Sequence, residues 1–172
     1  MSKQTVSPSS EPDLGIFKDF WESAIAYQKH NSLPCWYGFP EKTIVEEIRA
    51  GRHFTVREDG VILGCVSVLF TDPEIWEELE DGRAIYLHRM CVNPARKGNH
   101  LAAIMLKWAL EYSASMKRDF VRIDTWASNN RLIEYYLRCG FVAFGKKRPS
   151  NPEKLPPHYR NIELMLFQNS SV

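Results

Sequence analysis

No long run of hydrophobic residues occurs in this chain: a membrane-spanning helix needs about 18 consecutive apolar residues, and no such stretch is present. Residues 1–12 are polar and contain Ser and Pro in place of the apolar core of a secretion signal. Charge of one sign is not in excess either, since 22 basic side chains are balanced by 21 acidic ones. These absences predict a cytoplasmic protein that binds neither membranes nor nucleic acid.

Closely spaced cysteines are also missing. Cys35, Cys65, Cys91 and Cys139 are too widely separated for a zinc-binding pair and do not resemble a dense disulfide framework. We therefore expect reduced thiols and no metal ion. Two phosphate-binding patterns, G-x-x-x-x-G-K-[ST] and G-x-G-x-x-G, do not occur, and their absence disfavours a nucleotide-binding protein.

What the sequence does contain is typical of one globular domain. Its 172 residues are enough for one sizeable core but few for two, and 44% of them are hydrophobic while 25% are charged. No repeat and no linker divides the chain. We expect a flexible amino end over residues 1–12 and a single domain over residues 13–168.

The first half of the chain predicts two helices, a loop and a β-hairpin. The loop, Leu33–Pro40, breaks the helical spacing with two prolines and a glycine among three aromatic residues. The pair Asp59-Gly60 is a strong hairpin signal. The predicted elements are a helix over 14–31 with Asp13 as its cap, a short helix around 44–48, and strands over 53–57 and 61–70.

The second half alternates strands and helices. A strand–helix–strand–helix order favours two neighbouring parallel strands joined by a crossover helix. Gly140 falls where a helix C-cap is expected, and two closing strands are joined by a long proline-rich loop. The predicted elements are strands over 84–92, 120–126, 141–147 and 161–167, and helices over 99–116 and 129–138.

The turn between the first of these strands and its helix has the character of an anion site. Residues 92–102 read V-N-P-A-R-K-G-N-H-L-A. The backbone N–H groups at the first turn of a helix have no intrahelical partner and favour negative charge. Together with Arg96 and Lys97, they suit a phosphate-bearing ligand.

This segment resembles a motif of the GNAT superfamily of N-acyltransferases, which reads Val-x-Pro, two variable residues, Arg or Gln, two further residues, Gly, x, and Gly or Ala. Val92, Pro94 and Ala102 match that register. Lys97 takes the Arg or Gln position. His100 stands where the family usually has its central glycine.

A second family signature supports the resemblance. It runs Asn, six residues, Tyr, three residues, Gly-Phe, after a strand. Asn129, Tyr136 and Gly140-Phe141 fall on that spacing. The two matches lie in the expected order, and the resemblance covers the chain from about Leu14 to Phe167.

The resemblance implies an α/β (α+β) GNAT-like fold: a mixed, mostly antiparallel central sheet with a splayed parallel strand pair and helices on both faces. It also implies an acetyl-CoA-dependent N-acetyltransferase with acetyl-CoA as co-substrate. Strand backbone would pair with the pantetheine amides, and the helix N-terminus would hold the pyrophosphate. The cofactor-binding residues implied are Met90, Cys91, Val92, Lys97, Gly98, Asn99, His100, Leu101, Ala102 and Asn129.

Acetyl transfer to an amine calls for one base and one acid, because the protonated amine has a pKa of about 10 and the leaving thiol one of about 8.5. Tyr136 matches the family's general acid. His88, with an ordinary pKa of about 6.5, is a candidate base, although a strand histidine can serve packing alone. Glu134, Asp124 and a chain of waters are alternatives.

The acceptor pocket is expected at Trp36, Tyr37 and Phe39, whose rings suit an amine held against their faces, together with the loop Pro149–Tyr159. We expect the acceptor to be a primary amine of a small molecule or a peptide. An alternative is a non-catalytic acyl-CoA-binding or regulatory module. Exposed strand edges at the carboxyl end also make a homodimer plausible.

Overall fold

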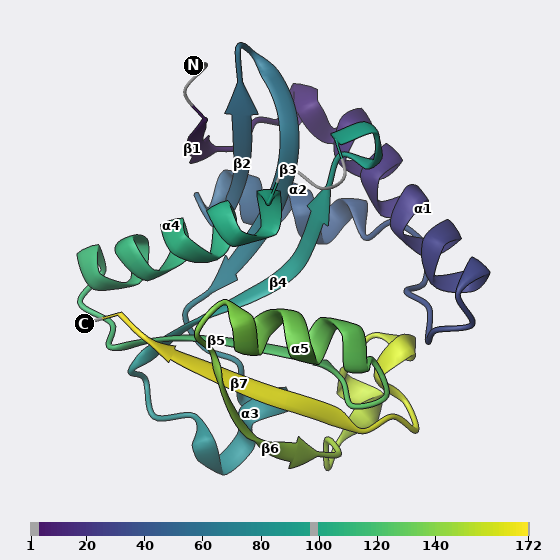
Figure 1. The fold of residues 1–172 in the computed structure, drawn as a ribbon, viewed down its shortest axis with the longest axis vertical. Helices are drawn as coiled ribbons and strands as arrows, with labels where there is room; N and C mark the ends of the chain where they lie inside the picture. Colours follow the sequence, from purple (N-terminus) through teal and green to yellow (C-terminus); the bar gives the residue numbers. More distant parts are fainter. Residues whose placement is uncertain (1–3, 97–99, 172) are drawn as a thin grey trace.

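The computed structural model describes residues 4–96 and 100–171. Their strands form one seven-stranded sheet in the order β1-β2-β3-β4-β5-β7-β6 (Figure 1). Only β4 and β5 run parallel; the other neighbours are antiparallel. This arrangement confirms the predicted mixed, mostly antiparallel sheet with one parallel pair.

The element bounds agree closely with the sequence pattern in the middle of the chain. The strands are β1 (Thr5–Pro8), β2 (His53–Glu58), β3 (Val61–Leu69), β4 (Ala84–Val92), β5 (Phe120–Trp126), β6 (Val142–Lys147) and β7 (Leu164–Ser170). The helices are α1 (Leu14–His30), α2 (Glu41–Arg49), α3 (Pro73–Trp76), α4 (Leu101–Ser115) and α5 (Asn130–Arg138). Short 3₁₀ turns lie at Glu11–Asp13, Glu77–Leu79, Pro94–Arg96, Pro152–Lys154 and Pro157–Tyr159.

The hairpin between β2 and β3 is confirmed, and its turn explains the Asp-Gly pair. Asp59 has φ 49° and Gly60 has φ 80°. Two consecutive residues with positive φ make a type I′ turn, which Asp and Gly tolerate best. Gly140 has φ 87° just after α5, as expected for a helix C-cap.

The amino end differs from the expected flexible segment. Thr5–Pro8 forms β1, which pairs antiparallel with β2 at the edge of the sheet. Ser9 follows it and is buried, with its Oγ 2.7 Å from Nδ1 of His53. An edge strand of four residues, two of them polar, is too short to show a hydrophobic alternation, so the sequence pattern could not reveal it.

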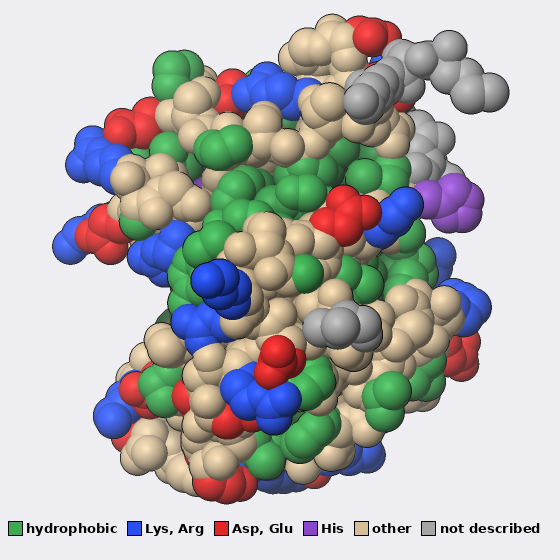
Figure 2. Space-filling model, turned by 90° about the vertical axis from the view of Figure 1, so that its left-hand side faces the viewer, with side chains coloured by type: hydrophobic (Ala, Val, Ile, Leu, Met, Phe, Trp, Pro, Cys, Tyr) green, Lys and Arg blue, Asp and Glu red, His purple; other side chains and the backbone are tan. Residues whose placement is uncertain are grey.

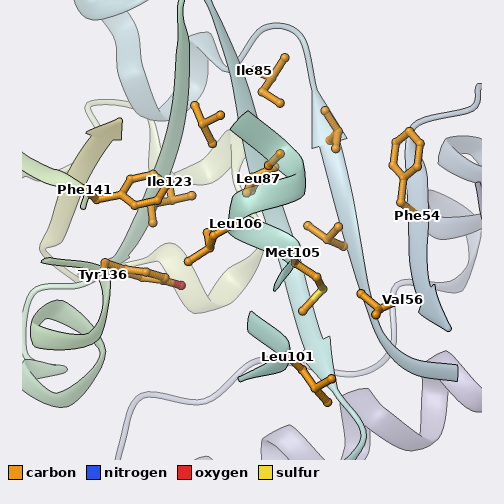
Figure 3. Packing of buried hydrophobic residues seen from close by; sticks show 14 of the residues in the cluster. Phe54, Val56, Ile85, Leu87, Leu101, Met105, Leu106, Ile123, Tyr136 and Phe141 are labelled. Atoms are coloured by element: carbon orange, nitrogen blue, oxygen red, sulfur yellow. The ribbon is translucent and has the colours of Figure 1, made fainter. Parts of the chain in front are cut away.

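Helices cover both faces of the sheet. Leu101, Met105 and Leu106 of α4, with Tyr136 of α5, pack on one face against Ile85 and neighbouring strand residues (Figure 3). On the other face, α1 and α2 bury an apolar cluster that includes Phe17, Trp21 and Ile44. A third cluster lies under α3, around Trp76, Tyr86 and Trp126. Among the helices of the described residues, none is long and apolar enough to cross a membrane.

The two parallel strands stay together for only three residue pairs. Ala84–Tyr86 pairs with Phe120–Arg122. Beyond this point β4 keeps pairing with β3 as far as Val92, whereas β5 keeps pairing with β7 as far as Trp126. The two halves of the sheet therefore part between β4 and β5 (Figure 1). The predicted splayed pair is confirmed.

Candidate active site

A cleft of about 1190 Å³ opens where β4 and β5 part. Its walls come from α1 and the loop after it, from β4 and β5, from the N-terminal turn of α4, from one side of α5, and from the loop Leu155–Tyr159. Viewed from the side, the surface is hollowed between the upper and lower halves of the molecule, with Lys and Arg side chains at the margin (Figure 2). Every predicted site residue that is described, except Phe39, lines this cleft.

His88 of β4 lies in the cleft between two carboxylates. Its Nε2 is 2.9 Å from Oδ2 of Asp72, which precedes α3, and donor atoms of Asp72, His88 and Asp124 all lie within 4.8 Å of one another. Burial lowers the pKa of His88, but the charge and hydrogen bond of Asp72 outweigh it and raise the pKa above its usual value. Asp72 thus fixes the orientation of the imidazole beside Asp124.

Asp124 of β5 is the second carboxylate of this group. Burial raises its pKa to about 6, against the opposing effect of the His88 charge. The Tyr159 hydroxyl lies 3.5 Å from Asp124 Oδ2. A carboxylate whose pKa lies near neutrality is well matched to accept a proton.

A bulge in β4 brings Arg89 to the cleft. Arg89 and Met90 together lie opposite the single residue Val66, since Cys65 pairs with Cys91 and Ser67 with His88. Arg89 has φ 51°, a left-handed conformation that is uncommon outside glycine. The bulge also changes which residues of β4 point toward α4. Before it, the odd-numbered Ile85 and Leu87 belong to the cluster under α4; after it, the even-numbered Met90 and Val92 pack against that cluster.

Tyr136 of α5 also lines the cleft, and α5 packs on the half of the sheet that contains β5 and β7. Its ring packs against Phe141 and Phe167, with centroids 6.1 and 5.6 Å apart, and in Figure 3 its hydroxyl points away from Phe141. Burial raises the pKa of the phenol, and the charge of Asp124 adds to this effect. The hydroxyl therefore stays protonated throughout the physiological range.

The segment predicted to hold the cofactor borders the same cleft. Met90, Cys91 and Val92 line it, and this part of β4 lies beyond the ladder with β5. His100, Leu101 and Ala102 line it at the start of α4. Lys97, Gly98 and Asn99 lie outside the described residues. Strand backbone and a helix N-terminus thus face one cavity, an arrangement that suits amides and phosphates respectively.

Two predicted cofactor residues have informative local geometry. His100 has φ 53° and ψ 25°, the left-handed region where a glycine is unstrained, and its backbone oxygen accepts the N–H of Ile104 at 3.0 Å. Asn129 caps α5, because its Oδ1 accepts the N–H of Leu132 at 3.2 Å. The Nδ2 group of Asn129 is therefore the part of its side chain that could serve a ligand.

The comparisons with known proteins agree with this geometry. Residues 15–141 match the model of the Acetyltransferase (GNAT) family, which is more than half of the chain and includes both signatures. The chain belongs to the GNAT acetyltransferase family.

Relatives of this GNAT chain are similar in sequence or in fold. It is 30% identical over 107 residues to the uncharacterized N-acetyltransferase YesJ of Bacillus subtilis, and the match spans 59% of each protein. A GNAT-family acetyltransferase structure from Listeria monocytogenes superposes with a TM-score of 0.77 at 24% identity, covering 97% of this chain and 94% of that one. The putative acetyltransferase YncA of Salmonella typhimurium, solved with acetyl-CoA, gives 0.70 at 14% identity and covers 99% and 95%.

Of the three predicted acceptor-pocket residues of this GNAT protein, two line the cleft and one does not. Trp36 and Tyr37 line the cleft, and Trp36 stacks on Trp21 with ring centroids 4.2 Å apart. Phe39 packs edge-on against Trp21 at 6.3 Å and does not line the cleft. Its ring packs instead against the apolar cluster of Phe17, Trp21 and Ile44.

Two cleft residues were not identified from the sequence. Asp72 lies in an acidic, turn-prone stretch that indicates only a loop. Arg89 follows His88 in an otherwise apolar strand, and two successive polar residues at this point are the signal that could have indicated the bulge. Asp72 pairs with His88 and Arg89 pairs with Glu47. Each partner lies in another element, so the spacing of residues along the sequence could not reveal these pairs.

Proposed function

We propose that this protein transfers the acetyl group of acetyl-CoA to a primary amine of a small molecule or peptide by direct attack. Tyr136 acts as the general acid and Asp124 as the proton acceptor. The observation that carries the proposal is that both groups line one cleft, at the point where β4 and β5 part.

The proton steps follow from the pKa values. Asp124, with its pKa raised by burial to about 6, takes a proton from the acceptor ammonium and frees the lone pair for attack on the thioester carbon. As the carbon–nitrogen bond forms and the carbon–sulfur bond breaks, Tyr136 gives its proton to the departing sulfur. The attacking nitrogen loses its second proton, which restores Tyr136, and the proton held by Asp124 leaves to solvent. The products are an amide and a free thiol.

His88 acts in this scheme through Asp124. Asp72 holds the imidazole by its Nε2 and raises the pKa of His88, so a larger fraction is protonated at neutral pH than in a free imidazole. A protonated His88 cannot accept a proton, but its charge helps Asp124 to stay ionised. We therefore favour Asp124 over His88 as the base.

The backbone of β4 supports the electrophile. Thioester attack creates an oxyanion, and a pre-placed N–H group near Met90 or Cys91 would contribute about 3 kcal/mol to its stabilisation. Met90, Cys91 and Val92 would pair with the pantetheine amides, and the N–H groups at the start of α4 would bind the pyrophosphate. Acetyl-CoA itself supplies the activated acyl group.

Purified protein incubated with acetyl-CoA and a panel of primary amines is expected to release free CoA and to form acetylated amine in equal amounts. Product mass and thiol release, measured separately, check this stoichiometry. Thermal stabilisation by acetyl-CoA with no transfer to any amine would contradict the enzyme and favour the alternative, a non-catalytic acyl-CoA-binding module.

Replacing His100 with Gly is expected to tighten acetyl-CoA binding by about 2- to 5-fold, because without a Cβ at this position phosphate can approach the backbone N–H groups more closely. Isothermal titration calorimetry measures the change. His100→Ala is the matched control, since it removes the imidazole and keeps the Cβ. Weaker binding by both variants would instead assign the imidazole a direct phosphate contact.

A further inference from the structure

The part of the cleft lined by His88, Asp124 and Tyr159, which we call the acceptor half, also contains Arg89, a guanidinium that is anchored by its neighbours. Its Nε–H donates to Ser67 Oγ at 3.2 Å, and its Nη2 forms an ion pair with Glu47 Oε1. Ser67 Oγ donates in turn to Glu47 Oε2 at 2.6 Å. Three elements, α2, β3 and the β4 bulge, therefore fix the plane of this guanidinium.

The anchoring leaves one edge of the guanidinium available. Only 4% of the Glu47 side chain is exposed, whereas 18% of the Arg89 side chain is exposed and borders the cleft. Within the described part of the chain, Nη1 has no hydrogen-bond partner. An arginine held by a buried carboxylate on one side presents its remaining N–H donors in the fixed fork that matches a second carboxylate.

The same half of the cleft contains a negative pole at Asp124. His88 and Tyr159 lie close enough to both Asp124 and Arg89 to be affected by their charges. Burial lowers the pKa of His88 and raises that of Tyr159; in addition, the charge of Asp124 raises both pKa values and the charge of Arg89 lowers both. The Tyr159 hydroxyl is also 3.5 Å from Asp124. A positive and a negative group thus border one compartment from two strands, β4 and β5.

Aromatic groups border this compartment. The rings of Tyr37 and His158 stack with centroids 6.4 Å apart and an interplanar angle of 14°. Burial lowers the pKa of His158 to about 4, so this wall is neutral at physiological pH. Leu155 and Pro156 continue it. The wall therefore suits an apolar substituent better than a second charge.

From this arrangement we infer that the acceptor is an amino acid with an apolar side chain, its carboxylate bound by Arg89 and its amino group directed to Asp124. The inference rests on the proposed function, whose acetyl transfer it narrows to one class of amine. A polyamine or an aminosugar has no carboxylate for Arg89, and the amino group at a peptide N-terminus is far from the terminal carboxylate.

Three acceptors that differ only at the carboxylate test the inference: leucine, leucinamide and 3-methylbutylamine. With the wild-type enzyme and rates expressed per concentration of free amine, kcat/KM for leucine is expected to exceed that for 3-methylbutylamine by about 10- to 100-fold, the value of one charge-assisted pair. Leucinamide should be intermediate. Acetylated product, measured by mass spectrometry, gives the rates.

Arg89→Gln should reduce the preference for leucine over 3-methylbutylamine to about one, and Arg89→Lys should retain part of it because a point charge remains. Arg83→Gln is the matched control, since Arg83 forms an exposed ion pair with Asp119 and does not line the cleft. That variant should keep the wild-type preference. If an Arg89 variant fails to fold, the wild-type comparison of the three acceptors still decides the question.

The outcomes separate the two proposals. Efficient acetylation of 3-methylbutylamine and leucinamide with little or none of leucine overturns the amino acid inference and leaves the acetyltransferase in place. Bound acetyl-CoA with no transfer to any of a broad amine panel overturns the proposed function and the inference with it. A preference for leucine that Arg89→Gln does not change assigns carboxylate recognition elsewhere and overturns the role of Arg89.

Discussion

Replacing Asp124 with Asn is expected to reduce acetyl transfer by about 10²- to 10⁴-fold, the usual contribution of a positioned general base. Asn keeps the size and the hydrogen-bonding capacity of the side chain toward Tyr159 but cannot accept the ammonium proton. Acetyl-CoA affinity should stay close to the wild-type value, since Asp124 faces the acceptor compartment. Steady-state kinetics and calorimetry on the same preparation separate the two effects.

The same substitution is expected to stabilise the fold at neutral pH. Burial raises the folded-state pKa of Asp124 to about 6 from the usual 3.8. Between these values the folded state binds more protons than the unfolded state, so the wild type gains stability as the pH falls through 6 and loses it as the pH rises. The charged wild-type carboxylate thus costs about 1 to 3 kcal/mol at pH 7.5, and the Asn variant should melt several degrees higher.

Thermal unfolding at pH 7.5 and at pH 5 measures this gain, which should shrink at the lower pH as the wild-type Asp124 takes up its proton. Asp119→Asn is the matched control: Asp119 forms an exposed pair with Arg83 and should affect neither activity nor this pH dependence. Full activity in Asp124→Asn would remove Asp124 from the mechanism and return His88 as the leading base.

The sequence predicted the parts of the fold that depend on local pattern. β4 and β5 have the predicted bounds, and α1, α5 and the turn at Asp59-Gly60 differ from the prediction by a residue at most. In each of these segments the apolar residues recur with the period of a helix or of a strand, and turn residues mark the ends. Local preference and tertiary packing therefore favour the same structure.

The parts that escaped prediction depend on contacts between distant elements. The bulge at Arg89 follows from its pairing with β3 and from its ion pair with Glu47 of α2, neither of which leaves a trace in the spacing of β4. Asp13 is the N-cap residue of α1, as predicted, but its side chain makes no capping hydrogen bond and pairs with Arg57 at 2.5 Å. Side chains held by long-range ion pairs are the ones that sequence spacing alone cannot place.

The site shows the same division. Tyr136 and Asn129 could be located because they belong to a fixed spacing around one strand and one helix. The group of Asp72, His88 and Asp124 draws on three separate elements. Asp124 was therefore only one of several candidate bases in the sequence, and burial beside His88 is the structural feature that favours it.

Replacing Tyr136 with Phe is expected to reduce kcat by about 10²-fold with little change in acetyl-CoA affinity, because the variant loses only the proton that the departing sulfur needs. The ring contacts with Phe141 and Phe167 involve carbon atoms that Phe retains. Thermal stability should therefore stay close to the wild-type value. Pre-steady-state measurement of CoA release reports the chemical step, and calorimetry reports cofactor binding.

Tyr112→Phe is the matched control for this experiment. Tyr112 also has a raised pKa caused by burial, but its ring stacks on Trp108 with centroids 5.0 Å apart and does not line the cleft. It should turn over at the wild-type rate. A Tyr136→Phe enzyme as fast as this control would show that the leaving thiolate needs no proton from the protein. A matched loss of rate and of acetyl-CoA binding would instead make Tyr136 a wall of the cofactor cleft.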